Sequence, residues 1–477
     1  MSIAQKAARG ALWTVISSMG GRVIGVFGTL IMTRFMKPEI IGEVSDASIL
    51  AMTASWISSV GFGPYAVVKG RGPDADEVTW HAVVFHLLLG TIAIGAIAAF
   101  GGRLMPLLDA PHAAAYVPGM ALSVWIRRWG TIPERILTRQ MKFRASGMAQ
   151  IAGEIAYTGS ALTLAAIGFC AATSPGQAIV VANIVQSTAM VVILIRASGL
   201  RDWTTRTPLR WARITDMVKF GLPIMIQGVA HAASRSWDNL LISRYFGTAT
   251  LGTYNMAYNL ADIPAIQVGE QLALVLMPSM AELPPERRPA AFERSSALLS
   301  LIIFPLAVGL GLVAYPLIAL ILPANNWQDV APLLVVLACL SIFRPITWVV
   351  SAYMEASSKT GRLMWIEIGK TIAILVGITM LARYGVRAAA AAVGLAFGLM
   401  AIAGVAMVLR EGPSPSRLLL GFLRPLLACG VMGVATWGTE QGLVKVGYDH
   451  PALLLFAEII VGAVAYVIAA FAIAPKT

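Results

Sequence analysis

Charged residues are scarce in this chain. Only 13% of its 477 residues are Asp, Glu, Lys or Arg, and 57% are hydrophobic. A soluble domain carries about 25% charged residues, and it cannot keep so much apolar surface away from water. A bilayer is the natural solvent for such a chain, since each crossing needs roughly 20 mostly apolar residues. The composition therefore predicts a multi-pass membrane protein.

Several kinds of chemistry are missing as well. The three cysteines, Cys170, Cys339 and Cys429, all lie in apolar runs and are typical of small core residues, not of a disulfide framework. No group of Cys, His and carboxylates has metal-ligand spacing, and no G-x-x-x-x-G-K-[ST] loop is present. The predicted loops are too short for the soluble catalytic domain that a membrane glycosyltransferase or polymerase would need. We expect no cofactor, no metal and no enzymatic activity.

What remains is a series of apolar segments. The first is too long for the core of a signal peptide and is expected to be an uncleaved helix. Twelve helices plus an ambiguous terminal pair is the alternative to fourteen. The predicted membrane spans are residues 11–33, 42–68, 81–105, 113–132, 148–171, 177–196, 220–243, 251–280, 296–322, 331–354, 363–382, 388–409, 418–438 and 451–474.

Basic residues favour one side of this series. When basic residues toward the end of a span, such as Arg128, are counted with the adjoining loop, 25 of the 36 Lys and Arg fall on the side of the N-terminus, seven on the other side and four within spans. Because positive loops stay in the cytoplasm, both termini are predicted to be cytoplasmic, and the net charge of +12 requires no nucleic-acid partner. The linkers 133–147 and 197–219, the latter with Trp203 and Trp211, are expected to lie on anionic membrane lipids.

An internal repeat divides the chain. Residues 33–52, TRFMKPEIIGEVSDASILAM, align without gaps with residues 243–262, SRYFGTATLGTYNMAYNLAD. Gly42 then matches Gly252. Both copies join two predicted helices across a short outside loop, and six helices separate them, so the two halves have the same orientation. A parallel repeat places a substrate site between the halves, near the middle of the membrane.

The fold class that follows is all-α and polytopic, with about 14 transmembrane helices arranged as two six-helix lobes with a pseudo-twofold repeat plus two C-terminal helices. The predicted domains are an N-lobe at 1–197, a cytoplasmic linker at 198–219, a C-lobe at 220–410 and the extra helices at 411–477.

Polar residues recur at helical spacing inside the predicted spans. A charge that faces lipid costs about 2.5–3.5 kcal/mol, so these faces should line a wet cavity or meet a partner helix. Arg235 and Asp238 are three residues apart, and a simple ion pair is the alternative to a cavity role. The candidate substrate-binding residues are Arg22, Gln227, His231, Arg235, Asn255, Asn259, Asp262 and Arg344, and the ion-coupling candidates are Asp238 and Asp262.

Two further features concern single positions. Arg344 precedes Pro345 in the middle of a span, where proline kinks the helix, and its guanidinium could meet a diphosphate or a freed carbonyl. Glu367 and Lys370 are three residues apart near an inside end, and a local ion pair is the better interpretation.

Three stretches carry a family resemblance. Residues 237–264, WDNLLISRYFGTATLGTYNMAYNLADIP, resemble the signature of bacterial polysaccharide transporters, as do residues 133–145, PERILTRQMKFRA. Residues 351–362, SAYMEASSKTGR, fit the same group more distantly. The chain is thus similar to the Wzx-type polysaccharide and oligosaccharide flippases. These share a superfamily with the lipid II flippases and the multidrug and toxin extrusion transporters.

The resemblance implies a function. It implies two lobes around a central cavity and alternating access. The substrate would be an undecaprenyl-diphosphate-linked oligosaccharide, moved across the bacterial inner membrane for exopolysaccharide or O-antigen assembly. A polysaccharide polymerase and chain-length machinery would be partners. Arginines would bind the diphosphate, and amides and carboxylates would bind sugar hydroxyls. An ion-coupled multidrug or cation antiporter and a lipid II flippase are the alternatives within the superfamily.

The topology can be tested by labelling single-cysteine variants in a cysteine-free background. Cysteines at Arg139, Arg206 and Arg287 should react only from the cytoplasmic side, and a cysteine at Lys445 only from the outside, because the basic loops orient the chain. Labelling of position 445 from the cytoplasm would contradict the fourteen-helix arrangement or its orientation.

Overall fold

The chain is all-α. The computed structural model describes residues 20–21, 23–70, 73–140, 142–168, 176–199, 201–264, 276, 279–280, 283–323, 326–357 and 359–473. Throughout these residues the regular structure is helical, without any strand. Nine of the helices found there are long and apolar enough to cross a membrane, and Val23–Met32 is a shorter apolar helix. The total of fourteen stays a prediction, since the predicted spans 11–33 and 251–280 lie partly outside the described residues.

The chain folds as two compact units, residues 1–252 and 253–477. Below they are called the N-terminal unit and the C-terminal unit. The division into lobes at 1–197 and 220–410 comes from the sequence repeat and stays a prediction.

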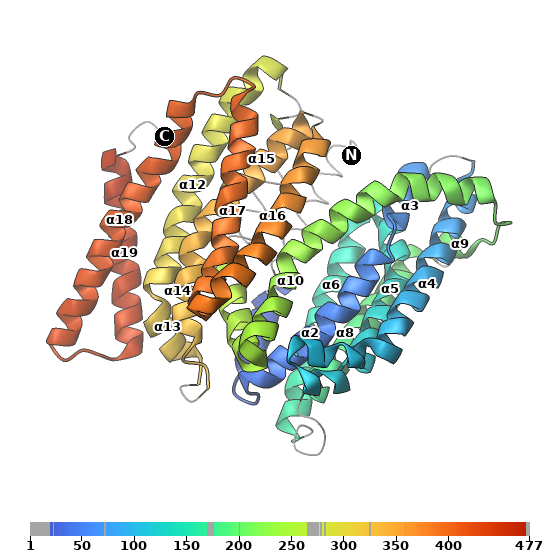
Figure 1. Ribbon diagram of the computed structural model, residues 1–477, viewed down its shortest axis with the longest axis horizontal. Helices are drawn as coiled ribbons and strands as arrows, with labels where there is room; N and C mark the ends of the chain where they lie inside the picture. Colours follow the sequence, from blue (N-terminus) through green and yellow to red (C-terminus); the bar gives the residue numbers. More distant parts are fainter. Residues whose placement is uncertain are drawn as a thin grey trace. The chain divides into compact units, whose positions relative to one another are not determined.

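In the N-terminal unit, whose helices are labelled in Figure 1, small residues let the helices pack closely. Helix α8 packs against α5 and α6, and α5 also packs against α2 and α4. Fully buried alanines such as Ala47, Ala121 and Ala182 lie in this core. The helices are α2 (Pro38–Ile57), α3 (Phe62–Lys69), α4 (Ala75–Phe100), α5 (Val117–Arg139), α6 (Phe143–Ala166), α8 (Gln177–Ser198) and the short α9 (Arg201–Thr204).

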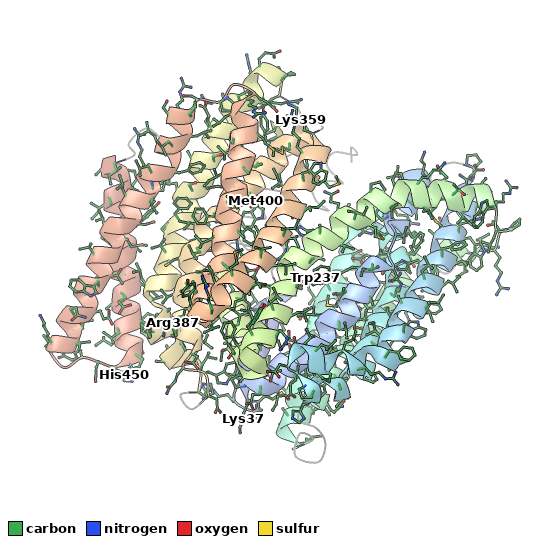
Figure 2. All side chains as sticks on the ribbon, viewed as in Figure 1. Lys37, Trp237, Lys359, Arg387, Met400 and His450 are labelled. Carbon is green, nitrogen blue, oxygen red and sulfur yellow. The ribbon has the colours of Figure 1, made fainter. Side chains whose placement is uncertain are left out.

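Helix α10 runs over Trp211–Pro264 and contains a sharp break. Gly247 has φ 81° and ψ 169°, a conformation that glycine adopts without steric cost. The break separates the two predicted helices at 220–243 and 251–280, within the predicted outside loop. Before it, the indole nitrogen of Trp237 (Figure 2) donates a hydrogen bond to Thr53 Oγ1 at 3.1 Å, which joins α10 to α2.

The two copies of the repeat meet at their shared glycine. A Cβ atom on Gly42 would overlap the backbone oxygen of Thr248, and a Cβ atom on Gly252 would overlap the backbone oxygen of Pro38. Pro38 and Thr248 are themselves equivalent in the repeat. Pro38 begins α2, and Thr248 follows the break at Gly247. A reciprocal contact of this kind is what a local twofold axis produces, and it confirms the repeat in three dimensions.

The C-terminal unit is built around α12 and α17. Helix α12 packs against α14, α15 and α18, while α17 packs against α14, α15 and α16, and α19 lies along α18. The helices are α12 (Arg288–Leu312), α13 (Ala314–Ile321), α14 (Val330–Leu340), α15 (Arg344–Ala356), α16 (Thr360–Leu381), α17 (Val386–Leu409), α18 (Pro415–Lys445) and α19 (Pro451–Ile473).

Proline divides one of these spans as predicted. Helix α14 ends at Leu340, a 3₁₀ turn covers Ser341–Phe343, and α15 begins at Arg344 with Pro345 in its first turn. Proline is tolerated there because the first backbone amides of a helix have no intrahelical acceptor. The interruption places Arg344 at the start of a helix in the middle of an apolar span.

Ion pairs and a hydrogen bond join three helix ends in the C-terminal unit. Lys359, labelled in Figure 2, lies 2.5 Å from the carboxylate of Glu411, which also accepts hydrogen bonds from Arg362 at 3.0 Å and from the hydroxyl of Tyr353 at 3.1 Å. These contacts join α15, the start of α16 and the segment after α17.

Most of the basic linker 133–147 is helical, because α5 continues to Arg139 and α6 begins at Phe143. The position on the lipid surface stays a prediction for this linker and is wrong for Trp203. Trp203 is 6% exposed and packs in an aromatic and aliphatic cluster beside α3 and α4, whereas Trp211 is 79% exposed.

The glycine contact predicts a difference between two substitutions on α10. Gly252→Ala should lower the melting temperature of the purified protein, because forcing a methyl group into a filled space costs about 1–3 kcal/mol. Gly228→Ala is the matched control. Nothing lies within 4 Å of its Cβ position, so alanine should leave stability equal or slightly higher. Equal melting temperatures for the two variants would contradict the close approach of the repeat copies.

Candidate functional site

Two buried ion pairs flank one aromatic ring in the C-terminal unit. The guanidinium of Arg344 pairs with the carboxylate of Asp262, and Lys370 Nζ lies 2.6 Å from Glu367 Oε2. The Arg344 Cζ atom and the Lys370 Nζ atom each lie 5.1 Å from the centre of the Phe397 ring. We call the set the charge cluster. It consists of Tyr258, Asp262, Arg344, Glu367, Lys370 and Phe397.

Four helices supply the charge cluster. Tyr258 and Asp262 lie one turn apart on α10, Arg344 begins α15, Glu367 and Lys370 lie on α16, and Phe397 lies on α17. Arg344 Cζ also lies 5.1 Å from the Tyr258 ring. Its guanidinium is therefore close to two aromatic rings, an arrangement that favours a cation.

The burial of the cluster explains the pairing. The side chains of Arg344 and Asp262 are 11% and 4% exposed. An isolated charge at such a place would lose its hydration without compensation. Asp262 and Arg344 are thus two predicted site residues that the structure brings together. The local pair expected for Glu367 and Lys370 is confirmed.

The four candidates Gln227, His231, Arg235 and Asp238, which lie at helical spacing on α10, differ in their exposure to solvent. His231 and Arg235 are exposed, Gln227 is half-buried and Asp238 is buried. The hydroxyl of Ser234 donates a hydrogen bond to the backbone oxygen of His231 at 2.8 Å. Helical spacing therefore does not place all four side chains in one environment. Their roles in binding and coupling stay predictions.

The remaining candidates are the two asparagines and Arg22. Asn255 is half-buried and Asn259 is exposed, and both lie on α10 before Asp262. Arg22 lies outside the described residues.

An apolar groove is lined in part by α15 and α17, two of the helices that carry the charge cluster. Its volume is about 290 Å³. Phe343 and Ile346 lie at one side, residues of α17 from Gly398 to Leu409 at another, and Leu418 and Phe422 of α18 complete it. Phe343 and Gly398 directly adjoin Arg344 and Phe397. Helices α15 and α17 thus contribute residues both to the charge cluster and to the apolar groove.

The sequence analysis missed one buried cation, Arg128. On α5 it is 3% exposed. Its Nε donates to the backbone oxygen of His86 at 2.8 Å, and its terminal nitrogens donate to the backbone oxygens of Ser55 and Ser58 at 3.0 and 2.8 Å. Two of these acceptors lie at the end of α2, whose last carbonyls have no intrahelical donor. A Cβ on Gly90 would overlap the guanidinium, so α4 needs glycine there.

The sequence did contain one indication that Arg128 is buried in the membrane. The residue lies inside the predicted span 113–132, but it was counted with the basic residues of the following loop. Its acceptors lie far away in the sequence, and no spacing rule indicates them.

Comparisons with known proteins agree on the family. A family model described as "Polysaccharide biosynthesis protein" matches residues 31–332. The succinoglycan biosynthesis transport protein ExoT of Rhizobium meliloti (strain 1021) is 25% identical over 377 residues, which cover 78% of this chain and 73% of that protein. The lipopolysaccharide biosynthesis protein WzxC of Escherichia coli (strain K12) is 19% identical over 392 residues, covering 81% and 78%.

Solved structures show the same fold. The lipid II flippase MurJ in an inward closed conformation matches with a TM-score of 0.77 and 14% identity, over 96% of this chain and 98% of that one. An inward-facing multidrug resistance transporter of the MATE family matches with a TM-score of 0.61 and 17% identity, over 86% and 95%. Together with the apolar helices, these matches identify a multi-pass membrane protein with this transporter fold. Because the family model covers more than half of its length, the chain belongs to the polysaccharide biosynthesis protein family.

Proposed function

We propose that the protein is a flippase that moves undecaprenyl-diphosphate-linked oligosaccharide repeat units across the bacterial inner membrane, for exopolysaccharide or O-antigen assembly. The head group would cross by alternating access between the two lobes, while the hydrocarbon tail stays in lipid. The termini are cytoplasmic in this proposal. The lipid-linked oligosaccharide and membrane lipids are the molecules bound, and a polymerase with its chain-length machinery is the downstream partner.

The observation that carries the proposal is the charge cluster, built on helices α15 and α17, which also line an apolar groove. A lipid-linked saccharide combines an anionic diphosphate with a long hydrocarbon chain. Arg344 offers a planar fork that suits phosphate oxygens. The groove from Phe343 and Gly398 to Phe422 offers a surface that suits the hydrocarbon. The family membership supports a polysaccharide precursor as the cargo.

The ion pair suggests how binding and release alternate. While Arg344 holds Asp262, its charge is compensated and its affinity for phosphate is low. A diphosphate that displaces the carboxylate, or a proton or cation that neutralises Asp262, makes the guanidinium available. Asn255 and Asn259, one and two turns before Asp262, would then bind sugar hydroxyls, and Gln227, His231 and Arg235 would serve the same cargo from the N-terminal unit. Asp238 would be the second coupling carboxylate.

Two alternatives share the fold. A drug or cation antiporter would rely on acidic side chains without a buried arginine, which the Arg344 site disfavours. A lipid II flippase would carry a similar head group, and the succinoglycan and lipopolysaccharide names of the relatives favour the polysaccharide cargo instead.

The charge pair can be tested by a double-mutant cycle. Arg344→Ala should reduce both folded protein and export, because removing one partner of a buried pair costs about 3–5 kcal/mol. Arg344→Gln with Asp262→Asn removes both charges and should restore folded protein. Export of glycan, measured per folded protein, should stay below about a tenth of the wild-type rate, since the phosphate ligand is gone.

The matched control is a second arginine–carboxylate pair. Arg417 and Glu293 lie 3.5 Å apart, and Arg417 is exposed. Arg417→Gln should leave export per folded protein unchanged, because this arginine is 75% exposed and its pair contributes little. Normal export by the doubly neutral Arg344 and Asp262 variant would show that this pair is structural, and it would contradict the proposed phosphate site.

A further inference from the structure

The N-terminal unit contains a cavity of about 420 Å³ among α2, α4, α5, α6 and α8. This volume is within the usual range of small-molecule sites, roughly 300–1,000 Å³. The cavity belongs to the N-terminal unit, whereas the residues of the charge cluster belong to the C-terminal unit. Its lining is mixed, with serine hydroxyls, two amides, one tryptophan and few charges. Such a mixed lining suits a small ligand that has both polar groups and an apolar face.

Unsatisfied polar atoms point to a ligand. His86 lines the cavity and is 2% exposed, yet neither of its ring nitrogens has a hydrogen-bond partner among the described residues. The hydroxyl of Ser146, also in the lining, is likewise buried without one. Leaving such groups unpaired is costly. A molecule in the cavity would satisfy them.

A second histidine on the same helix, His81, is also buried but has a hydrogen-bond partner for each ring nitrogen. His81 is fully buried, but its Nδ1 lies 2.8 Å from the backbone oxygen of Glu77, and its Nε2 accepts the backbone N–H of Arg210 at 2.9 Å. His81 therefore has a complete structural role. His86, five residues further along α4, is similarly buried, and its ring packs edge-on against Phe62 at 6.2 Å between ring centres, but neither ring nitrogen has a hydrogen-bond partner among the described residues.

The charges of the lining disfavour an anion. The nitrogens of Arg128 are already engaged with backbone oxygens and a serine hydroxyl. The other charged residues of the lining, Arg127 and Glu134, have opposite signs. A diphosphate would find little surplus positive charge. Hydroxyls, amides, an imidazole and an indole are the groups that bind a neutral polyhydroxylated ring.

We propose that this cavity is a second binding site, which takes a sugar ring of the cargo. The ring would lie against Trp56, and its hydroxyls would bond to His86, Ser146 and the amides of Gln150 and Asn183. The inference rests on the proposed function for the origin of the sugar. The binding chemistry depends only on the cavity.

The test uses the full-length protein in lipid nanodiscs. The probe is the repeat-unit oligosaccharide from the host's own lipid-linked precursor, released from its diphosphate by mild acid. Wild-type protein should bind this free glycan in isothermal titration. His86→Leu should weaken binding about tenfold, through the loss of hydrogen bonds to the imidazole. Its melting temperature without glycan should equal or exceed that of wild type, because an unpaired buried ring has been removed.

His81→Leu is the control. It should lower the melting temperature and leave the affinity of the folded protein for the glycan unchanged. Equal affinity for wild type and His86→Leu would overturn the proposal, as would displacement of the glycan by inorganic diphosphate. The probe has no lipid, and titration involves no translocation. Failure here is therefore distinguishable from failure of the Arg344 and Asp262 variants in export.

Discussion

A charge inside an apolar protein must be compensated where it lies, and the fold depends on this constraint. In the described residues the chain meets it with different partners. Arg128 is held by backbone oxygens, Arg344 by the carboxylate of Asp262, and Lys370 by Glu367. Arg128 and Arg344 each tie together helices that are distant in the sequence. Removing any one partner would leave a group without water or a counter-charge.

The two buried arginines, Arg128 and Arg344, differ in whether their partners can release them. Backbone oxygens carry no proton at ordinary pH and cannot move away from a helix end, so Arg128 is fixed to α2 and α4. Asp262 is a carboxylate, which a proton, a cation or a competing anion can separate from Arg344. The first arrangement suits a rigid scaffold, and the second suits a site that changes state. This difference is the physical basis for placing phosphate binding at Arg344.

Local patterns in the sequence predicted local structure. The break at Pro345, the pair of Glu367 and Lys370 and the turn between the two parts of α10 each depend on residues that are close in the chain. The repeat matched Gly42 with Gly252 in the sequence without predicting a contact, and the structure places each glycine against the backbone of the other copy.

Features that join distant segments could not be predicted in this way. Asp262 and Arg344 were both candidates, but nothing in their spacing indicates that they pair. Arg128 was counted as a loop charge because its acceptors lie on α2 and α4. Asp238 shares a helical stripe with Arg235 but not its exposure, since burial depends on which helix packs against each turn. The cavity beside His86 is created by five helices.

The central claim is that the protein moves a lipid-linked oligosaccharide across a bilayer. The most direct measurement uses vesicles that contain the purified protein and the host's own lipid-linked repeat unit, with a lectin outside to detect glycan that reaches the outer leaflet. The account predicts that glycan exposure rises faster than in protein-free vesicles, and that a fluorescent cationic drug is not moved. An exposure rate equal to that of protein-free vesicles, or transport of the drug instead, would contradict it.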